Sequence, residues 1–304
     1  MKTAFLFPGQ GTQSVGMGKD LYDHINIYRQ TFDICEAGAG IDLRAACFEG
    51  ARMDESEVAQ PAIFAHTISL LSTVQNEGID ADIVAGLSLG EYSAMTAAGV
   101  FEADLCATLV RKRGRIMDDA FPKGTGGMLS VIGFTVLEVE DAIKDYSDAY
   151  VANHLSELQS VVAAKTSDLL ALKEVFEQKG AKLATLLNVN GPSHAPLLSA
   201  AADEFLHVLE NVNLGMMRKT VYSNALGKPY SQGGDVKKLL ANQMCSRVRW
   251  HECIEHMIAS GVERYVEIGP SNVLSKLLKR RVKKGVEVVS VRDLPTLERF
   301  FNKQ

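Results

Sequence analysis

Short apolar runs alternate with amphipathic stretches along the 304 residues of the chain. Five runs have the β-branched and aromatic content of buried strands, at residues 3–7, 83–85, 221–223, 265–268 and 286–291. Most of them are separated by stretches whose apolar residues follow the helical period. Buried strands that alternate with helices are typical of a mostly parallel sheet with both faces covered, so we expect an α/β fold.

The order of the predicted elements changes between Gly124 and about Gly191. Here the pattern predicts strands at residues 128–132, 150–153, 160–164 and 181–186, and helices at residues 135–146 and 167–179. This β-α-β-β-α-β order is that of ferredoxin-like units. Turn-forming residues at 122–127 and 190–193 flank the segment and favour hinges. We therefore predict a ferredoxin-like subdomain at 124–194, inserted into a large subdomain made of 1–123 and 195–304.

Composition narrows the possible class of protein. Lys and Arg number 32 against 37 Asp and Glu, a net charge of −5, so no global positive field favours nucleic acid. Five cysteines without a C-x-x-C pair argue against a disulfide framework and a thiolate zinc site. The first residues lack the features of a signal peptide, and the apolar stretch at 61–74 is too short to cross a bilayer, so it predicts a buried helix. We expect a cytoplasmic protein that binds neither membrane nor nucleic acid and holds no metal.

The clearest candidate for catalysis is a serine in a tight turn. Residues 83–95 are Ile-Val-Ala-Gly-Leu-Ser-Leu-Gly-Glu-Tyr-Ser-Ala-Met, which predicts a strand, a G-x-S-x-G turn and a helix. A nucleophile elbow has this context, because the sharp turn leaves no room for side chains beside the serine. Ser88 would then lie at a helix N-terminus, where negative charge is stabilised. With 25 glycines, chance alone gives roughly 0.1–0.15 such matches, so a capping serine in an ordinary turn is the alternative.

A serine nucleophile needs a general base, and seven histidines are available. His194 is the best candidate because it lies in a turn at the predicted hinge, and catalytic groups are common on such loops. No Asp or Glu is placed to mark a third triad member, and a solvated loop histidine is the alternative. The other histidines fall in helical runs, in a polar segment or in the small unit, and the pair at 251 and 256 has the wrong spacing for zinc: His24, His66, His154, His207, His251 and His256.

Six motifs in order along the chain resemble those of one family. They are Phe-Pro-Gly-Gln-Gly-Thr-Gln at 7–13, Gly-Leu-Ser-Leu-Gly-Glu-Tyr-Ser at 86–93, Arg113-Gly114, Pro-Ser-His at 192–194, Asn242-Gln243 and Glu-Ile-Gly-Pro at 267–270. With them the chain resembles the malonyl-CoA:acyl carrier protein transacylases of type II fatty acid synthesis over nearly its whole length. The resemblance implies an α/β-hydrolase-like large subdomain with a ferredoxin-like insertion.

The resemblance also implies an activity and a set of roles. The expected reaction moves a malonyl group from CoA to the phosphopantetheine thiol of acyl carrier protein by a ping-pong mechanism through a malonyl-serine, in a monomer without further cofactor. The implied roles are nucleophile for Ser88, base for His194, oxyanion-hole N–H groups for Gln10 and Leu89, carboxylate clamp for Arg113 and histidine orientation for Gln243. A guanidinium fits a planar carboxylate with two hydrogen bonds, so Arg113 would select a dicarboxylic acyl group, although the alternative is a solvated helix arginine.

Several features leave alternatives open. Leu87 stands where the family often has histidine, and residues 153–159 stand where an Asn-Ser-Pro-Gly-Gln loop is common. The basic residues at 276–284 suit either a carrier protein's phosphate and acidic helix or a solvated helix end. A trans-acting polyketide-synthase acyltransferase, a serine acyl-hydrolase and a catalytically silent docking subunit remain the competing functions.

Overall fold

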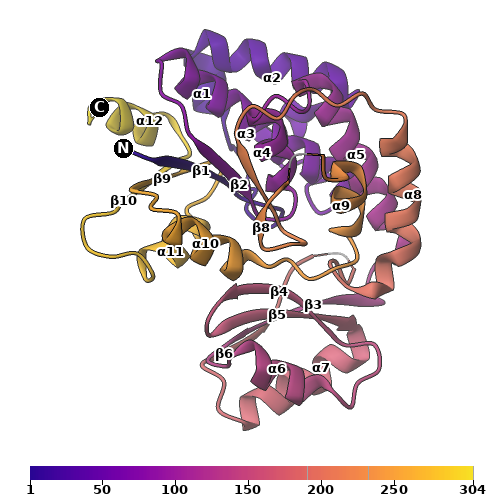
Figure 1. Ribbon diagram of the computed structural model, residues 1–304. Helices are drawn as coiled ribbons and strands as arrows, with labels where there is room; N and C mark the ends of the chain where they lie inside the picture. Colours follow the sequence, from indigo (N-terminus) through magenta and orange to yellow (C-terminus); the bar gives the residue numbers. More distant parts are fainter. Residues whose placement is uncertain (190, 232, 304) are drawn as a thin grey trace. The chain divides into compact units, whose positions relative to one another are not determined.

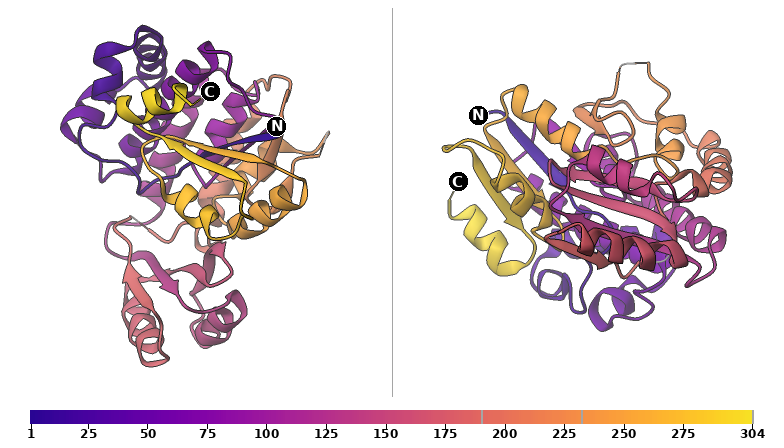
Figure 2. Two further views of the ribbon diagram at one scale, coloured as in Figure 1. Left: turned by 90° about the vertical axis from the view of Figure 1, so that its left-hand side faces the viewer. Right: turned by 90° about the horizontal axis from the view of Figure 1, so that it is seen from below.

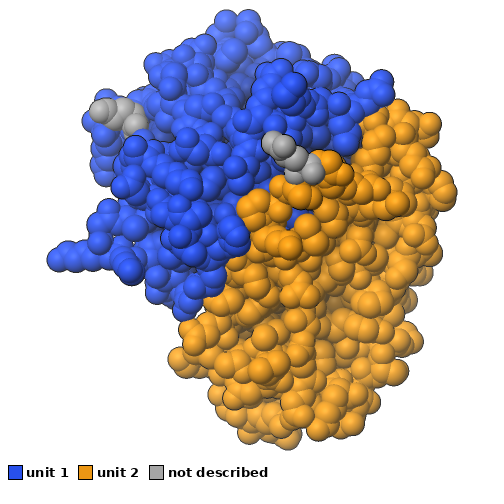
Figure 3. Space-filling model, in the orientation of Figure 1, with its two compact units in different colours: residues 1–114, 213–223, 254–304 blue, residues 115–212, 224–253 orange. Residues whose placement is uncertain are grey.

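The computed structural model describes residues 1–189, 191–231 and 233–303, so the predicted hinge residue Asn190 lies outside the described residues. The chain divides into two compact units, coloured separately in Figure 3. Unit 1 consists of residues 1–114, 213–223 and 254–304, and unit 2 of residues 115–212 and 224–253. Each unit therefore contains segments that are distant in the sequence.

Unit 1 is built on a parallel sheet (Figure 1). Its strands run in the order β10-β9-β1-β2-β7 and every neighbouring pair is parallel. Their bounds are β1 Thr3–Phe7, β2 Ile83–Gly86, β7 Thr220–Ser223, β9 Arg264–Ile268 and β10 Glu287–Val291. All residues of β1, β2 and β9 are buried, as expected for strands covered on both faces. The predicted α/β class is confirmed.

Helices lie on both sides of this sheet, as Figure 2 shows for β9 and β10. The helices with all or most of their residues in unit 1 are α1 Lys19–His24, α2 Asn26–Ala39, α3 Ser56–Asn76, α4 Gly90–Ala97, α5 Ala103–Ala120, α10 Trp250–Ala259, α11 Val273–Lys279 and α12 Leu294–Phe301, with a π-helical turn at Ala45–Glu49. Nearly every residue of α3 is buried, which confirms the helix predicted at 61–74. Within the described residues, no helix is long and apolar enough to span a bilayer.

Unit 2 contains the predicted β-α-β-β-α-β order. Its elements are β3 Gly126–Ile132, α6 Val136–Ile143, β4 Tyr150–Ser156, β5 Gln159–Lys165, α7 Thr166–Gln178 and β6 Leu183–Leu186. The antiparallel sheet has the order β4-β5-β3-β6, which is the ferredoxin-like arrangement. Leu129, Val162 and Phe176 belong to a core cluster in which residues of the sheet and of both helices are buried together. The ferredoxin-like prediction is confirmed.

Unit 2 also contains elements outside the ferredoxin-like order. They are the 3-10 turn Pro196–Leu198, α8 Ser199–Glu210, β8 Lys228–Pro229 and α9 Val236–Asn242. The segment after α9 is hydrogen-bonded to β4, because the Val248 N–H donates to the Ala152 carbonyl at 2.8 Å and the His154 N–H donates to the Val248 carbonyl at 2.9 Å. Residues 153–159 form a tight hairpin in which Ser156 pairs with Gln159.

Candidate active site

The structure places Ser88 in the predicted turn between β2 and α4. Its φ angle is 53°, in the left-handed region, which costs a residue other than glycine about 1–3 kcal/mol. Among the described residues, the non-glycine positions with positive φ are Arg52, Ser88 and His194. Strained backbone of this kind is concentrated at functional sites. Two of these three positions are the predicted nucleophile and the predicted base.

The glycines on either side of Ser88 are required by close backbone contacts. A Cβ on Gly86 would lie 1.9 Å from the carbonyl carbon and oxygen of Gly90, and a Cβ on Gly90 would lie 2.1 Å from the carbonyl oxygen of Phe7. The Leu87 N–H also donates to the Phe7 carbonyl at 2.9 Å, which ties the turn to β1. The serine therefore stands at the N-terminus of α4, in the strand-turn-helix context of a nucleophile elbow.

The turn after β1 lies against the serine turn. A Cβ on Gly9 would be 2.5 Å from the Leu87 carbonyl oxygen, so the two backbones touch there. Gln10 follows Gly9 in the first turn and Leu89 follows Ser88 in the second. The structure thus brings together the two short segments that carry the predicted oxyanion-hole N–H groups.

The Glu-Ile-Gly-Pro motif at 267–270 supports this arrangement without contributing chemistry. The buried Glu267 carboxylate accepts the Ser275 N–H at 2.7 Å and the Ser271 hydroxyl at 2.9 Å, which holds the start of α11. Burial raises the pKa of this carboxyl group above its usual value. A Cβ on Gly269 would lie 2.7 Å from Cγ of Pro8, so the motif packs against the turn that contains Gln10.

Arg113 lies beside the candidate nucleophile. Its Nη2 donates to Ser88 Oγ at 3.3 Å, its Nη1 donates to Gln60 Oε1 at 2.8 Å, and its Cζ lies 5.4 Å from the centre of the Tyr92 ring. The residue is only 1% exposed, so the alternative of a solvated helix arginine is wrong. Burial lowers the pKa of the guanidinium, while Tyr92 and Glu91 raise it. A buried, positively charged guanidinium therefore lies next to the serine hydroxyl.

The glycine after Arg113 explains how the guanidinium reaches this place. A Cβ on Gly114 would lie 2.2 Å from the Ser56 carbonyl oxygen, so α5 packs directly on the first turn of α3. Arg111 strengthens the same contact, because it binds the Glu57 carboxylate at 2.8 Å. Close helix packing therefore carries Arg113 inward from an otherwise charged segment.

Gln60 is a site residue that the sequence analysis missed. It is fully buried in α3, accepts from Arg113 and donates through Nε2 to Gln10 Oε1 at 3.2 Å. Gln10 Nε2 in turn donates to the Ser56 hydroxyl at 3.1 Å. A polar side chain within the apolar run of α3 was the available signal, because buried polar groups need hydrogen-bond partners.

In unit 2 the structure brings His194 and Gln243 together. His194 is 4% exposed, and its ring Nδ1 is 2.7 Å from the main-chain carbonyl oxygen of Gln243. The main-chain N–H of His194 donates to the Met244 carbonyl at 2.9 Å. A carbonyl oxygen only accepts, so Nδ1 carries the proton of the neutral ring. Nε2 is then the basic nitrogen, as a general base requires.

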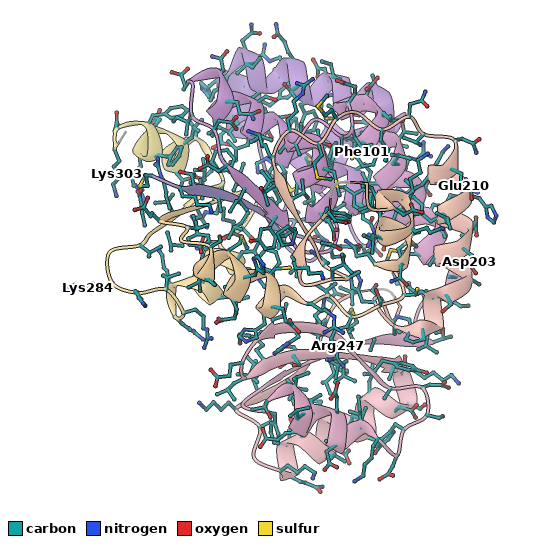
Figure 4. All side chains as sticks on the ribbon, in the orientation of Figure 1. Phe101, Asp203, Glu210, Arg247, Lys284 and Lys303 are labelled. Carbon is teal, nitrogen blue, oxygen red and sulfur yellow. The ribbon has the colours of Figure 1, made fainter. Side chains whose placement is uncertain are left out.

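Residues 243–248, which begin with the carbonyls that accept these bonds from His194, are hydrogen-bonded to the ferredoxin-like sheet at their C-terminal end. Val248 is hydrogen-bonded to β4, as described above, and Arg247, labelled in Figure 4, forms an ion pair with Glu140 of α6. Arg247 Nε also donates to the Val151 carbonyl at 3.3 Å. These contacts fix the position of Gln243 relative to the ferredoxin-like sheet.

The five cysteines are free thiols, and four of them are buried. In the part of the chain that the structure describes, no group of three or more His, Cys, Asp and Glu side chains is arranged to hold a metal ion. The basic residues at 276–284 are exposed at the end of α11 and beyond it, where Arg281 binds Glu255 at 2.7 Å.

The fold and the serine turn define an acyl transferase, and the acyl transferase domain family matches residues 4–302. The malonyl CoA-acyl carrier protein transacylase of Bacillus subtilis (strain 168) is 35% identical over 98% of this chain and 95% of its own length. A polyketide biosynthesis malonyl CoA-acyl carrier protein transacylase of Bacillus velezensis is 34% identical over 91% and 95%. The chain belongs to the malonyl CoA-acyl carrier protein transacylase family.

Solved structures of the family have the same fold. The malonyl CoA-acyl carrier protein transacylase of Clostridium perfringens superimposes with a TM-score of 0.94 at 33% identity, covering 100% of this chain and 97% of that one. A malonyl-transacylase in complex with its type II polyketide-synthase acyl-carrier protein superimposes with a TM-score of 0.94 at 32% identity, covering 100% of both chains. The α/β architecture with a separate antiparallel sheet is therefore that of the family.

Proposed function

We propose that this protein transfers a malonyl group from CoA to the phosphopantetheine thiol of an acyl carrier protein in fatty acid synthesis. The observation that carries the proposal is the buried guanidinium of Arg113, 3.3 Å from Ser88 Oγ. In a malonyl ester of Ser88, the free carboxylate lies two carbon–carbon bonds beyond the acyl carbonyl, roughly 3–4 Å from Oγ for bonds of about 1.5 Å. A cation this close to the hydroxyl matches a three-carbon diacid.

In the first half-reaction, Ser88 Oγ attacks the thioester carbonyl of malonyl-CoA and its proton passes to Nε2 of His194. The Gln243 carbonyl holds the opposite edge of the ring and stabilises the imidazolium, in the place that a carboxylate takes in other triads. The N–H groups of Gln10 and Leu89, with the N-terminus of α4, stabilise the oxyanion. The C–S bond then breaks, and the imidazolium returns the proton to the CoA sulfur.

The second half-reaction reverses these steps with another thiol. CoA leaves, the phosphopantetheine arm enters, and His194 takes the proton of its thiol as the sulfur attacks the malonyl-serine carbonyl. The ester C–O bond breaks and Ser88 Oγ regains a proton from the imidazolium. Throughout, Arg113 holds the malonyl carboxylate, which is present in every intermediate but absent from an acetyl group.

The proposal is tested by following the label of malonyl-CoA in the presence of a carrier protein. Transfer predicts label on the carrier's thiol, whereas the hydrolase alternative predicts free malonate even when carrier is present. A silent docking subunit predicts neither product. Because one relative is a polyketide biosynthesis enzyme, carriers of fatty acid and polyketide type are compared. Faster transfer to the polyketide carrier would overturn the assignment to fatty acid synthesis.

We also propose that the basic residues at 276–284 contact the acidic carrier protein. Residues 276–303 contain nine Lys and Arg against three Asp and Glu, whereas the rest of the chain contains 23 against 34, so positive charge is concentrated in this segment. Such a patch attracts an acidic partner. Lys283→Glu with Lys284→Glu should raise the KM for carrier protein and leave acylation by malonyl-CoA unchanged. An unchanged KM would contradict this contact.

Two further proposals concern the chain as a whole. Residues 124–194 act as an inserted subdomain, so their slowest amides should exchange with solvent as one cooperative unit, distinct from those of the large subdomain.

The second proposal is that the protein acts as a monomer and needs neither a metal nor an additional cofactor. Activity should then survive prolonged chelation, and active protein should sediment with a mass of 33.0 kDa. Loss of activity on chelation, or activity only in a larger species, would contradict this second proposal.

A further inference from the structure

Gln60 connects two parts of the site that the proposed reaction uses for different purposes. Its Oε1 accepts from Arg113 Nη1 at 2.8 Å, and its Nε2 donates to Gln10 Oε1 at 3.2 Å. Arg113 faces the acyl carboxylate in the proposed reaction, and Gln10 supplies an oxyanion N–H. One buried amide is therefore bonded to the side chains of both groups.

The direction of this hydrogen-bond chain is fixed by chemistry. A guanidinium has only donors, so the oxygen of the Gln60 amide must face Arg113. The amide nitrogen then faces the oxygen of Gln10, and the nitrogen of Gln10 donates to the Ser56 hydroxyl at 3.1 Å. Turning either amide over would place donors against donors inside a buried site. The orientation of Arg113 and that of the Gln10 side chain are thus set together.

The charge of the Gln60 acceptor matters as much as its position. An amide oxygen holds Nη1 without cancelling the positive charge of the guanidinium, whereas a carboxylate of the same shape would form a stronger ion pair with it. The Nη2 group, which bonds to Ser88 Oγ at 3.3 Å, is the one directed to the reacting ester. Because the acceptor on Nη1 is neutral, it does not compete for the charge of the guanidinium with the carboxylate of an incoming malonyl group at Nη2.

We propose that Gln60 is a positioning and specificity-determining residue for the malonyl group, because its neutral amide holds Arg113 facing Ser88 and anchors Gln10. The inference rests on the proposed function. It predicts that the choice between a dicarboxylic and a monocarboxylic acyl group depends on residue 60, although the side chain of Gln60 makes no bond to the acyl group itself. A purely structural role would reduce transfer of both kinds of acyl group alike.

Two substitutions and one matched control test this inference. Gln60→Glu keeps the shape but places a carboxylate on Nη1, so kcat/KM for malonyl-CoA should fall roughly 100-fold, the upper part of the range for a charged hydrogen bond. Transfer from acetyl-CoA should fall less, by roughly 3- to 10-fold, because acetyl has no carboxylate to be repelled and loses only the effect of the neutral hydrogen bond from Gln60 Nε2 to Gln10 Oε1. Gln60→Met removes the acceptor with little change of volume and should lower the malonyl-to-acetyl ratio about 10-fold. Gln75→Met, in the same helix, removes an amide that donates to Asp80 at 3.1 Å outside the site and should keep the parent ratio.

The outcomes separate this inference from the proposed function. If the parent protein forms no malonyl-serine, the proposed function fails whatever the variants do. If the parent is acylated but the Gln60→Glu ratio stays within about twofold of the parent, or both acyl donors fall in parallel, the inference is overturned. Thermal unfolding of each variant shows whether it is folded. Should Gln60→Glu not fold, the Gln60→Met ratio decides by the same criterion.

Discussion

Replacing Arg113 by alanine should change which acyl group the protein accepts. The substitution removes the donor to Ser88 Oγ at 3.3 Å and the donor to Gln60 at 2.8 Å from a position that is 1% exposed. A hydrogen bond to a charged group contributes about 1.5–3 kcal/mol. At about 1.4 kcal/mol for each factor of ten, the malonyl-to-acetyl ratio of kcat/KM should fall roughly 10- to 150-fold. Because Arg113 is only 1% exposed, water screens its charge weakly, and we expect the upper half of that range.

The assay compares malonyl-CoA and acetyl-CoA as donors to the same carrier protein. Arg111→Ala is the matched control, since Arg111 lies two residues away in α5 but binds Glu57. It should reduce stability and keep the parent ratio. Arg113→Lys should give an intermediate ratio, because an ammonium keeps the charge but lacks the planar fork. A parent-like ratio in Arg113→Ala, or an equal fall in Arg111→Ala, would refute the carboxylate clamp.

Two further substitutions test the turn and a buried histidine. Gly90→Ala places a Cβ 2.1 Å from the Phe7 carbonyl oxygen, so the turn must open. We expect the free energy of unfolding in urea to fall by about 2–4 kcal/mol, and acylation of the protein to be lost. Values like those of the parent protein would contradict this steric reasoning. Burial lowers the pKa of His66 from its usual 6.5 to about 4. Between these two pH values, the unfolded chain binds a proton at this histidine and the folded protein does not. The free energy of unfolding should therefore fall by up to about 3 kcal/mol as the pH falls from 6.5 to 4. His66→Gln should remove this part of the pH dependence, and equal slopes in variant and parent would contradict it.

Local patterns in the sequence were sufficient to predict most of the fold. The run at 3–7 coincides with β1, and the β-α-β-β-α-β order of unit 2 followed from alternating strand and helix periods. The serine turn was also predictable, because Gly86, Ser88 and Gly90 form a local G-x-S-x-G pattern between strand-like and helix-like residues, although the contact that requires Gly90 is with distant Phe7. The patterns that predict these features are local in the sequence.

Features that depend on distant contacts were less accessible. The charged segment around Arg113 is typical of a solvated helix face, and its burial results from Gly114 packing on Ser56, far away in the sequence. Gln60 gives only a weak local signal, a polar side chain in the apolar run of α3, because its partners Gln10 and Arg113 are distant in the sequence. The resemblance implies histidine orientation by Gln243, but the atom that contacts His194 Nδ1 is the main-chain carbonyl oxygen of this residue, which no side-chain pattern predicts.

The most direct test of the whole account is mass spectrometry of the Ser88 peptide after brief exposure of the protein to malonyl-CoA without carrier. We predict that this peptide gains the mass of one malonyl group, that Ser88→Ala gains none, and that adding carrier protein removes the group from the parent. A malonyl adduct on another residue, or an adduct that persists in Ser88→Ala, would contradict the assignment of Ser88 as the nucleophile.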